Sequence, residues 1–202
     1  MSEEVSIMLY RVESSTNMKE DLTSNYIEAL GWCISSMVAH TAGELQNLCK
    51  SGVWYEIHSY DGLVEEKTWR DFLDGNIDDE STVTELDEIM SDEFTDYKFA
   101  FCFKDLTKYQ IDNFSNIALL YYELRKSNVL ERQAIITKAL DYECWILDRD
   151  STWYGDSIPD EWIKQLTSTI YNCPDDMQLF FNEYESIIEQ INQANEDYWN
   201  EH

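Results

Sequence analysis

Residues 177–198 read MQLFFNEYESIIEQINQANEDY, and this stretch decides the expected fold. Its apolar side chains recur in steps of three and four residues, which places them along one side of an α-helix. That row consists of Met177, Phe180, Tyr184, Ile187, Ile191, Ala194 and Tyr198. Pro174 is expected in the first turn, with Asp175 and Asp176 beside the positive end of the helix dipole. The sequence therefore predicts one long amphipathic helix that runs to the C-terminus.

Short strands are expected upstream of this helix. In residues 5–10, Val5, Ile7 and Leu9 alternate with Ser6, Met8 and Tyr10. Residues 53–60 are rich in aromatic and β-branched side chains, and residues 97–103 read YKFAFCF. These patterns are typical of strands in a small sheet. The Asp61–Gly62 dipeptide predicts a turn into a further short strand, and residues 145–147 fit a brief strand or a buried connection.

Helices are expected between these strands. Residues 21–50 have helical spacing, with a break where Thr41 and Glu44 stand at the spacing of a capping box. Gly52 is expected to end this segment. Further helices are expected at 106–126, at 128–141 with Asn128 as its cap, and from about Pro159 onward.

The predicted fold class is α+β. The chain is expected to form a helix-rich single domain, 1–202, with a small, mainly antiparallel sheet and a long C-terminal amphipathic helix. A sub-division into a mixed α/β half, 1–103, and a helical half, 104–202, stays open. With 44% hydrophobic and 14% aromatic residues, the chain should fold and differs from acidic disordered tails.

The acidic residues are unevenly distributed along the chain. Over the whole chain 41 acids face 14 bases, for a net charge of −27. Residues 71–97 hold eleven acids and residues 165–202 hold eight, and neither segment contains Lys or Arg. Residues 98–138, by contrast, carry a net charge of +3. In a folded chain this acidic the charge opposes compaction, aids solubility and steers basic partners toward it, so the pattern points to a binding function.

No enzyme, metal centre or cofactor site is expected. The glycines are isolated, so there is no phosphate-binding loop, and His40, His58 and His202 lack the spacing of a metal site. Cys33 and His40 would share a helix face, but a nucleophilic thiol needs surroundings that lower its pKa. The acids at 74–80 lack the alternation of a calcium loop, so only adventitious binding of Ca²⁺ or Mg²⁺ is expected there.

The cysteine and hydropathy patterns predict a cytoplasmic protein. Five cysteines are widely spaced, with no C-x-x-C pair and no secretory signal, and are expected to stay reduced. No apolar run approaches the length of a membrane-spanning helix, and anionic lipids repel an acidic surface. Membrane association is therefore not expected. Direct binding to nucleic acid is not expected either, because it needs a basic groove.

The acidic segments are predicted to form rows of carboxylates on helices. Thr82 and Glu85 stand at capping-box spacing and predict a short helix whose outer face is acidic. Residues three or four apart on a helix are separated by about 5–6 Å along its axis, and phosphates on a DNA strand by about 3.4 Å. The rows Glu85–Glu88–Asp92 and Glu185–Glu189 would then offer a two-stranded anionic surface to a protein that binds phosphates.

In size, acidity, aromatic content and acidic helices the chain resembles the DNA-mimic inhibitors of phages and mobile elements, the antirestriction and anti-CRISPR proteins. The resemblance implies a non-enzymatic inhibitor without a cofactor, acting in a bacterial host cell. Its partner would be a basic nucleic-acid-binding protein, namely an antiphage defence nuclease or effector. The expected phosphate surrogates are Asp78, Asp79, Glu80, Glu85, Glu88, Asp92, Glu93, Glu185, Glu189 and Glu196.

Three alternatives stay open. The first is an immunity protein that neutralises a nuclease toxin, with aromatic anchors such as Trp153 or Tyr154. The second is an acidic adaptor or assembly protein whose C-terminal helix packs on a partner or on a second copy, which would make a homodimer. The third is an ordinary solvated acidic face, or the acidity of a salt-adapted proteome.

Overall fold

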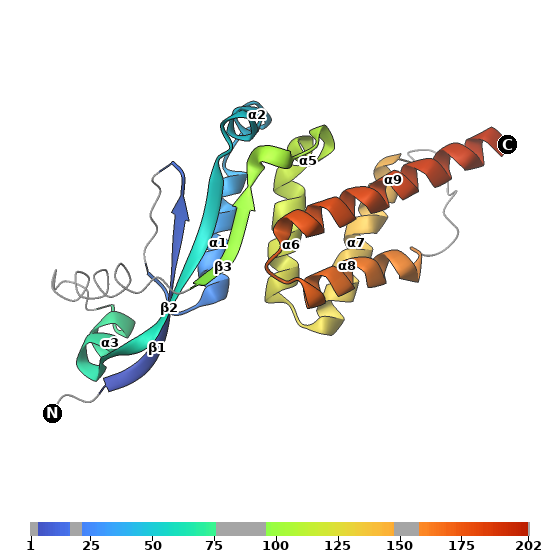
Figure 1. Ribbon diagram of the computed structural model, residues 1–202. Coiled ribbons are helices and arrows are strands. Elements are labelled where there is room, and N and C mark those ends of the chain that lie inside the picture. The colour runs from blue at the N-terminus through green and yellow to red at the C-terminus, as the bar shows by residue number, and fades with distance from the viewer. Residues whose placement is uncertain (1–3, 17–21, 76–95, 148–157, 202) are drawn as a thin grey trace. The chain divides into compact units, whose positions relative to one another are not determined.

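The computed structural model describes residues 4–16, 22–75, 96–147 and 158–201, and within them the predicted α+β class is confirmed. The described residues form a three-stranded antiparallel sheet, several helices and a long C-terminal helix (Figure 1). The chain divides into two compact units, which we call the sheet unit, residues 1–33 and 53–100, and the helical unit, residues 34–52 and 101–202. Two of the three divisions fall within α1 (Tyr26–Val38) and β3 (Asp96–Cys102), and the third lies between Gly52 and Val53.

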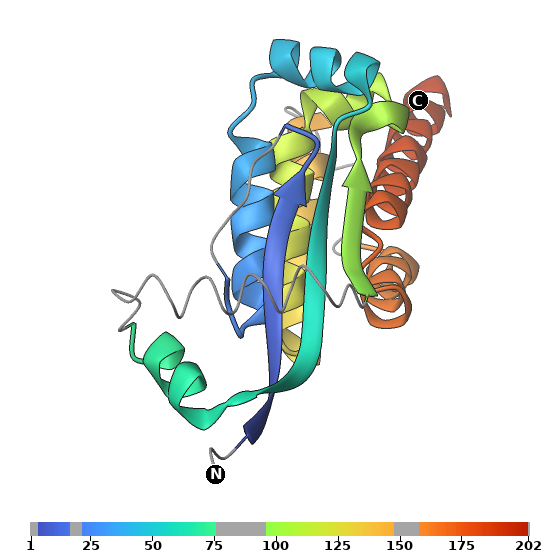
Figure 2. The same ribbon diagram turned by 60° about the vertical axis from the view of Figure 1, so that its left-hand side comes forward.

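The sheet has β2 (Trp54–Glu65) in the middle, between β1 (Glu4–Ser14) and β3 (Figure 2). β1 and β2 pair antiparallel along their whole length, from Glu4 opposite Glu65 to Ser14 opposite Tyr55. The three strands that the sequence predicted at 5–10, 53–60 and 97–103 are thereby confirmed, and β1 and β2 are longer than expected.

The predicted turn at Asp61–Gly62 is wrong, because β2 continues through both residues. Asp61 lies opposite Met8 and Gly62 opposite Ile7. A Cβ atom at Gly62 would lie 2.1 Å from the hydroxyl of Tyr60, so the glycine makes room for that side chain within the strand. Register with β1 therefore outweighs the local turn preference. The further strand expected after the turn is replaced by α3 (Glu66–Leu73).

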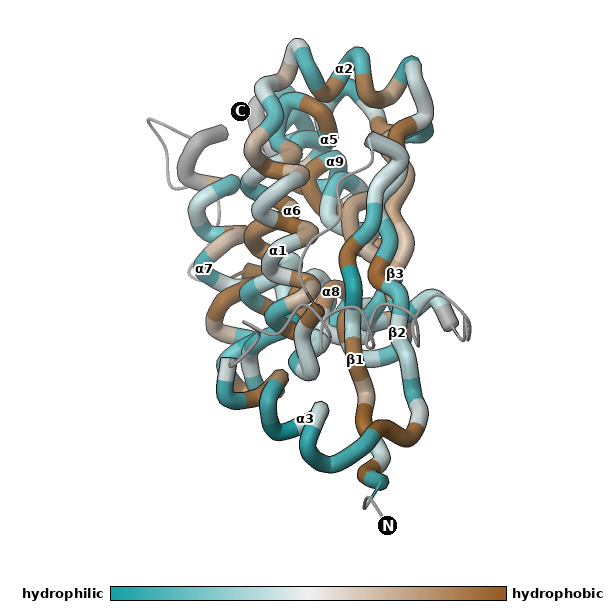
Figure 3. Tube along the Cα trace, turned by 90° about the vertical axis from the view of Figure 1, so that its left-hand side faces the viewer, coloured by the Kyte–Doolittle hydropathy of each residue, from teal (hydrophilic) through white to brown (hydrophobic). Residues whose placement is uncertain are grey.

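One face of the sheet carries an apolar cluster that holds α3. Its buried members are Ile7, Leu9, Tyr60 and Val64. Trp69 and Phe72 of α3 pack against this cluster, with their rings stacked at 5.4 Å between centroids. The rest of α3 is mainly hydrophilic, as Figure 3 shows. Amphipathic spacing therefore fixes this short helix to the sheet.

The helical unit contains the C-terminal end of α1 and most of the remaining elements. These are α2 (Ala42–Ser51), η1 (Phe103–Asp105), α5 (Lys108–Asp112), α6 (Phe114–Lys126), α7 (Val129–Leu147), α8 (Asp160–Asn172) and α9 (Met177–Glu201). Aromatic side chains fill its core, and Phe114 lies between Phe103 and Phe181 at centroid distances of 5.2 and 5.3 Å. All three rings are almost fully buried, so aromatic packing is the main apolar contribution at this point.

Most predicted helix boundaries are confirmed by their caps. The amide of Thr41 donates to the Glu44 carboxylate at 2.7 Å, which completes the capping box that starts α2. Gly52 ends α2 in the left-handed region, with φ 64°. The Asn128 side chain accepts from the Leu130 and Glu131 amides and starts α7 as expected. α8 begins directly after Pro159, also as expected.

Two predicted elements in the helical unit are wrong. Residues 106–126 form two helices rather than one, because the chain breaks at Asn113 between α5 and α6. Residues 145–147 form the last turn of α7 rather than a brief strand or a connection between elements. Their apolar sequence cannot by itself separate a short strand from the end of a buried helix.

Candidate functional site

The site is built on α9, whose start is fixed by its neighbours in the helical unit. The Leu179 amide donates to the Asp176 carboxylate at 2.8 Å, so Asp176 is the N-cap. Pro174 lies before the helix, which corrects the expected first-turn position. Its carbonyl accepts a hydrogen bond from the Tyr121 hydroxyl at 2.6 Å, and Asp175 pairs with Arg125 at 2.8 Å. These contacts tie the start of α9 to α6.

The predicted apolar row of α9 forms part of the core of the helical unit. Met177, Phe180, Ile187 and Ile191 are fully buried, and Tyr184 is almost so. Ala194 is half-buried, and the Tyr198 side chain lies outside the described residues. The row therefore packs within its own unit, which removes it as the partner-binding face of an adaptor.

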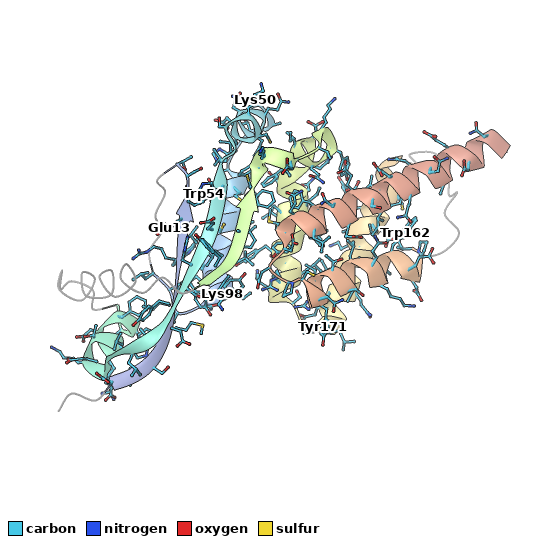
Figure 4. The ribbon with its side chains drawn as sticks, in the orientation of Figure 1. Glu13, Lys50, Trp54, Lys98, Trp162 and Tyr171 are labelled. Carbon is cyan, nitrogen blue, oxygen red and sulfur yellow. The ribbon has the colours of Figure 1, made fainter. Side chains whose placement is uncertain are left out.

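One flank of α9 is hydrogen-bonded to α8. The indole N–H of Trp162 donates to the Gln190 side chain at 3.0 Å, and the Gln165 amide donates to the Glu183 carboxylate. Figure 4 shows Trp162 on the side of α8 that is turned toward α9. Glu183 and Gln190 thus serve helix packing rather than an outside partner.

The opposite flank of α9 is hydrogen-bonded to α5 through Glu185, one of the predicted phosphate surrogates. The Thr107 hydroxyl donates to this carboxylate at 2.7 Å, and the fully buried Gln110 amide donates to it at 2.8 Å. Gln110 also donates to the Asn182 side chain at 3.0 Å. The Glu185 carboxylate is therefore engaged inside the helical unit, and an arginine or lysine from a partner would have to compete with these donors.

Glu189 and Glu196 lie along the solvent-facing side of α9, and both are exposed. Within the described ranges neither carboxylate has a hydrogen bond or an ion pair to another residue. Asp197 is also exposed and accepts a hydrogen bond from the Gln193 amide of the same helix, at 2.8 Å. Figure 1 shows the last turns of α9 extending beyond α8. Because residues 165–202 contain no Lys or Arg, no base of this segment offsets these charges.

A second polar group, formed by Glu143, Tyr184 and Tyr109, was not expected from the sequence. Glu143 of α7 accepts a hydrogen bond from the Tyr184 hydroxyl at 3.1 Å, and burial raises the pKa of its carboxyl despite that bond. Burial also raises the pKa of the Tyr109 phenol, with Glu143 and Glu185 adding to the effect. In the part of the chain that the structure describes, the Tyr109 hydroxyl is buried without a hydrogen-bond partner. The group links α5, α7 and α9.

Other chemistry in the described residues would depend on the cysteines and on the metal-binding residue types. Burial strongly raises the pKa of the Cys33 thiol, so this residue stays a thiol and is a poor nucleophile. All five cysteines are free. Among residues 4–16, 22–75, 96–147 and 158–201, no group of three His, Cys, Asp or Glu could hold a metal ion, and no helix has the length and apolarity to cross a bilayer.

Several predicted site residues lie outside the described residues. They are Asp78, Asp79, Glu80, Glu85, Glu88, Asp92, Glu93, Trp153 and Tyr154. The described part of the predicted site therefore consists of Glu185, Glu189 and Glu196 on α9. Neither a family model nor a curated protein nor a solved structure matches the chain.

Proposed function

We propose that this protein is a non-enzymatic inhibitor whose acidic surface occupies the basic groove of a nucleic-acid-binding protein. The partner we favour is a bacterial antiphage defence nuclease or effector. The observation that carries the proposal is the solvent-facing side of α9, where Glu189, Glu196 and Asp197 are exposed on a segment without Lys or Arg. We call these three residues the α9 acidic row.

The spacing of the α9 acidic row supports contacts to groups that normally bind phosphates. An α-helix rises about 1.5 Å per residue, so Glu189 and Glu196 are separated by about 10 Å along the axis. Phosphates on one DNA strand are about 3.4 Å apart along its axis, so the two carboxylates correspond to about every third phosphate. Arginine and lysine side chains form charge-assisted hydrogen bonds with carboxylates as they do with phosphates.

The anchoring of α9 supports a preformed surface. The buried Phe180, Ile187 and Ile191 fix the helix in the core, and Glu185 fixes its flank to α5. A helix held in this way presents its acidic row without an ordering cost at the moment of binding. The segment 71–97 holds eleven further acids and no Lys or Arg, and its predicted surrogates at 78–93 lie outside the described residues.

An inhibition assay with purified restriction and RNA-guided nucleases tests the proposal. The full-length protein is expected to inhibit DNA cleavage by at least one nuclease in the panel, and inhibition should weaken from about 0.1 M to about 1 M salt, because exposed charges are screened. Inhibition by an immunity protein would rest on a few aromatic anchors and would resist salt. No inhibition anywhere in the panel at low salt would exclude the proposal for these enzyme classes.

Charge-matched variants test whether α9 is the surface involved. Glu189→Lys, Glu196→Lys and Asp197→Lys together should weaken inhibition by more than about tenfold, since each exposed pair contributes up to about 1 kcal/mol. The control combines Glu4→Lys, Asp61→Lys and Glu65→Lys on the sheet unit, where all three acids are exposed. Both variants change the net charge equally. Equal loss of inhibition in the two variants would indicate a general charge effect and contradict a role for α9.

A further inference from the structure

One end of the helical unit exposes three large apolar side chains. Val129 and Leu130 begin α7 and are 55% and 80% exposed, and Tyr171 in the last turn of α8 is 74% exposed. Figure 4 shows Tyr171 at this end of α8. We call Val129, Leu130 and Tyr171 the bundle-end surface. Single exposed apolar residues are common, but a group of large ones at one place is typical of an interaction site.

The helices that carry this surface are held together by contacts between the end of α6 and the turn that joins α8 to α9. The Tyr121 hydroxyl donates to the Pro174 carbonyl, and Arg125 pairs with Asp175, so the end of α6 is tied to the turn between α8 and α9. α7 starts directly after α6 and also packs against α8. Figure 1 shows the start of α7 and the end of α8 at the same end of the helical unit. The bundle-end surface therefore comes from neighbouring helix ends.

The position of Val129 and Leu130 in α7 has no explanation in helix stability. They occupy the first two positions of the helix, which favour acidic residues or proline. Asn128 already caps the helix, and Glu131 returns a hydrogen bond to the Asn128 amide at 3.0 Å. In a chain with 41 acids, two exposed apolar residues at these positions add neither a capping contact nor burial within the chain.

The charges around the bundle-end surface almost cancel. The ionisable residues of the turn between α6 and α7, the turn between α8 and α9 and the adjoining helix ends are Arg125, Lys126, Arg132, Glu123, Glu131, Asp175 and Asp176, with a net charge of −1. Lys126 pairs with Glu123 at 3.1 Å, and Arg125 pairs with Asp175 at 2.8 Å. Arg132 donates to the Leu124 carbonyl at 2.7 Å. In a chain with a net charge of −27, this end is close to neutral.

We propose that the bundle-end surface is the interface of a homodimer in which the same surface of each copy meets the other. Two acidic copies repel each other, and repulsion is weakest where local charges are already paired. A basic partner, by contrast, would be attracted to the α9 acidic row, because the bundle-end surface is nearly neutral and attracts it only weakly. A stable interface buries about 800 Å² on each side, which is more than three side chains supply. The turn between α6 and α7 and the turn between α8 and α9 would therefore also take part in the contact.

Sedimentation equilibrium of the full-length protein tests the dimer. We expect association to strengthen as salt rises from about 0.1 M to about 1 M, because the screening length falls from about 10 Å to about 3 Å and the repulsion between copies falls with it. This dependence is opposite to the one expected for nuclease inhibition. A monomeric mass at every salt concentration, up to the highest protein concentration, would overturn the proposal.

Paired substitutions locate the interface. Leu130→Ser with Tyr171→Ser should weaken dimerisation by more than about a hundredfold, since each copy loses two apolar side chains from the contact. Tyr142→Ser is the control, because Tyr142 is 57% exposed on α7 in its C-terminal half. Circular dichroism confirms that each variant is folded. Equal association of the double variant and the wild type would overturn the assignment of the surface.

The dimer proposal is independent of the inhibitor proposal. If the double variant is monomeric and still inhibits a nuclease, both proposals hold and the dimer is not needed for inhibition. If the wild type dimerises through this end but inhibits no nuclease, the dimer stands and the proposed function fails. If the wild type is monomeric and inhibits, only the dimer fails.

Discussion

The two sides of α9 differ in burial and in the kind of side chain they carry, although they belong to one helix. On the core side, Phe180, Ile187 and Ile191 are fully buried among the helices of the unit. On the solvent side, Glu189 and Glu196 are exposed and have no ion pair to a described residue. Each core side chain is fixed by its own neighbours, so each should matter individually for stability. The exposed carboxylates act through a shared field, so they should matter for binding only as a group.

The largest expected effect comes from removing the core side of α9. A chain that stops after Pro174 should lose the cooperative fold of the helical unit, because each buried side chain of this kind contributes about 1.5–3 kcal/mol. A chain that stops after Gln193 keeps each α9 side chain that the structure describes as fully buried, and it should unfold cooperatively. Thermal unfolding followed by circular dichroism distinguishes the two chains. A cooperative transition in the shorter chain would contradict the core assignment of α9.

A single substitution on the core side should have the next largest effect. Phe180→Ala removes a ring that packs on Tyr121 at 5.6 Å and leaves a cavity, so it should lower the free energy of unfolding by about 3–5 kcal/mol. Asn192→Ala, at the exposed position directly after the buried Ile191, should change the free energy of unfolding by less than about 0.5 kcal/mol. Urea unfolding measures the free energy of unfolding of both variants. Equal values would contradict the distinction between a core side and a solvent side of α9.

Two carboxylates on neighbouring turns sharpen the comparison. Glu185→Ala removes the acceptor for Thr107 and the buried Gln110, and should lower the free energy of unfolding by about 1.5–3 kcal/mol. Glu189→Ala removes an exposed carboxylate and should change it by less than about 0.5 kcal/mol. Urea titrations of the two variants give the difference directly. A Glu185 variant as stable as the Glu189 variant would show that the bonds to α5 contribute nothing net.

The smallest effect concerns the pH dependence of stability at Glu143. Burial raises the pKa of this carboxyl above its usual value near 4.5, so its ionisation is less favourable in the folded state than in the unfolded state. Its contribution to stability is complete below about pH 4.5 and is lost as pH rises through the raised pKa. Glu143→Gln should therefore gain stability relative to the wild type as pH rises from about 4.5 through the raised pKa.

The matched control for this prediction is Glu189→Gln, which removes the same charge from an exposed site. Its stability relative to the wild type should change little over the same pH range, apart from the general reduction in self-repulsion. Thermal unfolding across the pH series measures both variants. Parallel curves for the two would mean that burial of Glu143 has no effect on its titration.

Local sequence signals predicted much of the fold. The Thr41–Glu44 capping box, the left-handed Gly52 and the Asn128 cap are contacts within a few residues, and each was readable from residue type and spacing. The Thr107–Gln110 pair carries the same kind of signal, and it starts α5. That signal was missed because the helical spacing of 106–126 favoured a single helix.

Long-range pairing explains the elements that the sequence misassigned. The Asp61–Gly62 dipeptide is a strong local turn signal, but its partners Met8 and Ile7 are more than fifty positions away in the chain. Only the register of β1 against β2 shows that the strand continues. The apolar residues 145–147 likewise extend α7, which their composition alone leaves undecided.

By itself the sequence determined the α+β class, the acidity and the amphipathic character of the C-terminal helix, because composition and periodicity are local properties. Only the tertiary structure decided which carboxylates are engaged: Glu185 bonds to α5 and Glu143 to Tyr184, while Glu189 stays exposed. These residues look alike in the sequence. They differ in their neighbours from distant helices, and those neighbours set the desolvation and the hydrogen bonds that each carboxylate meets.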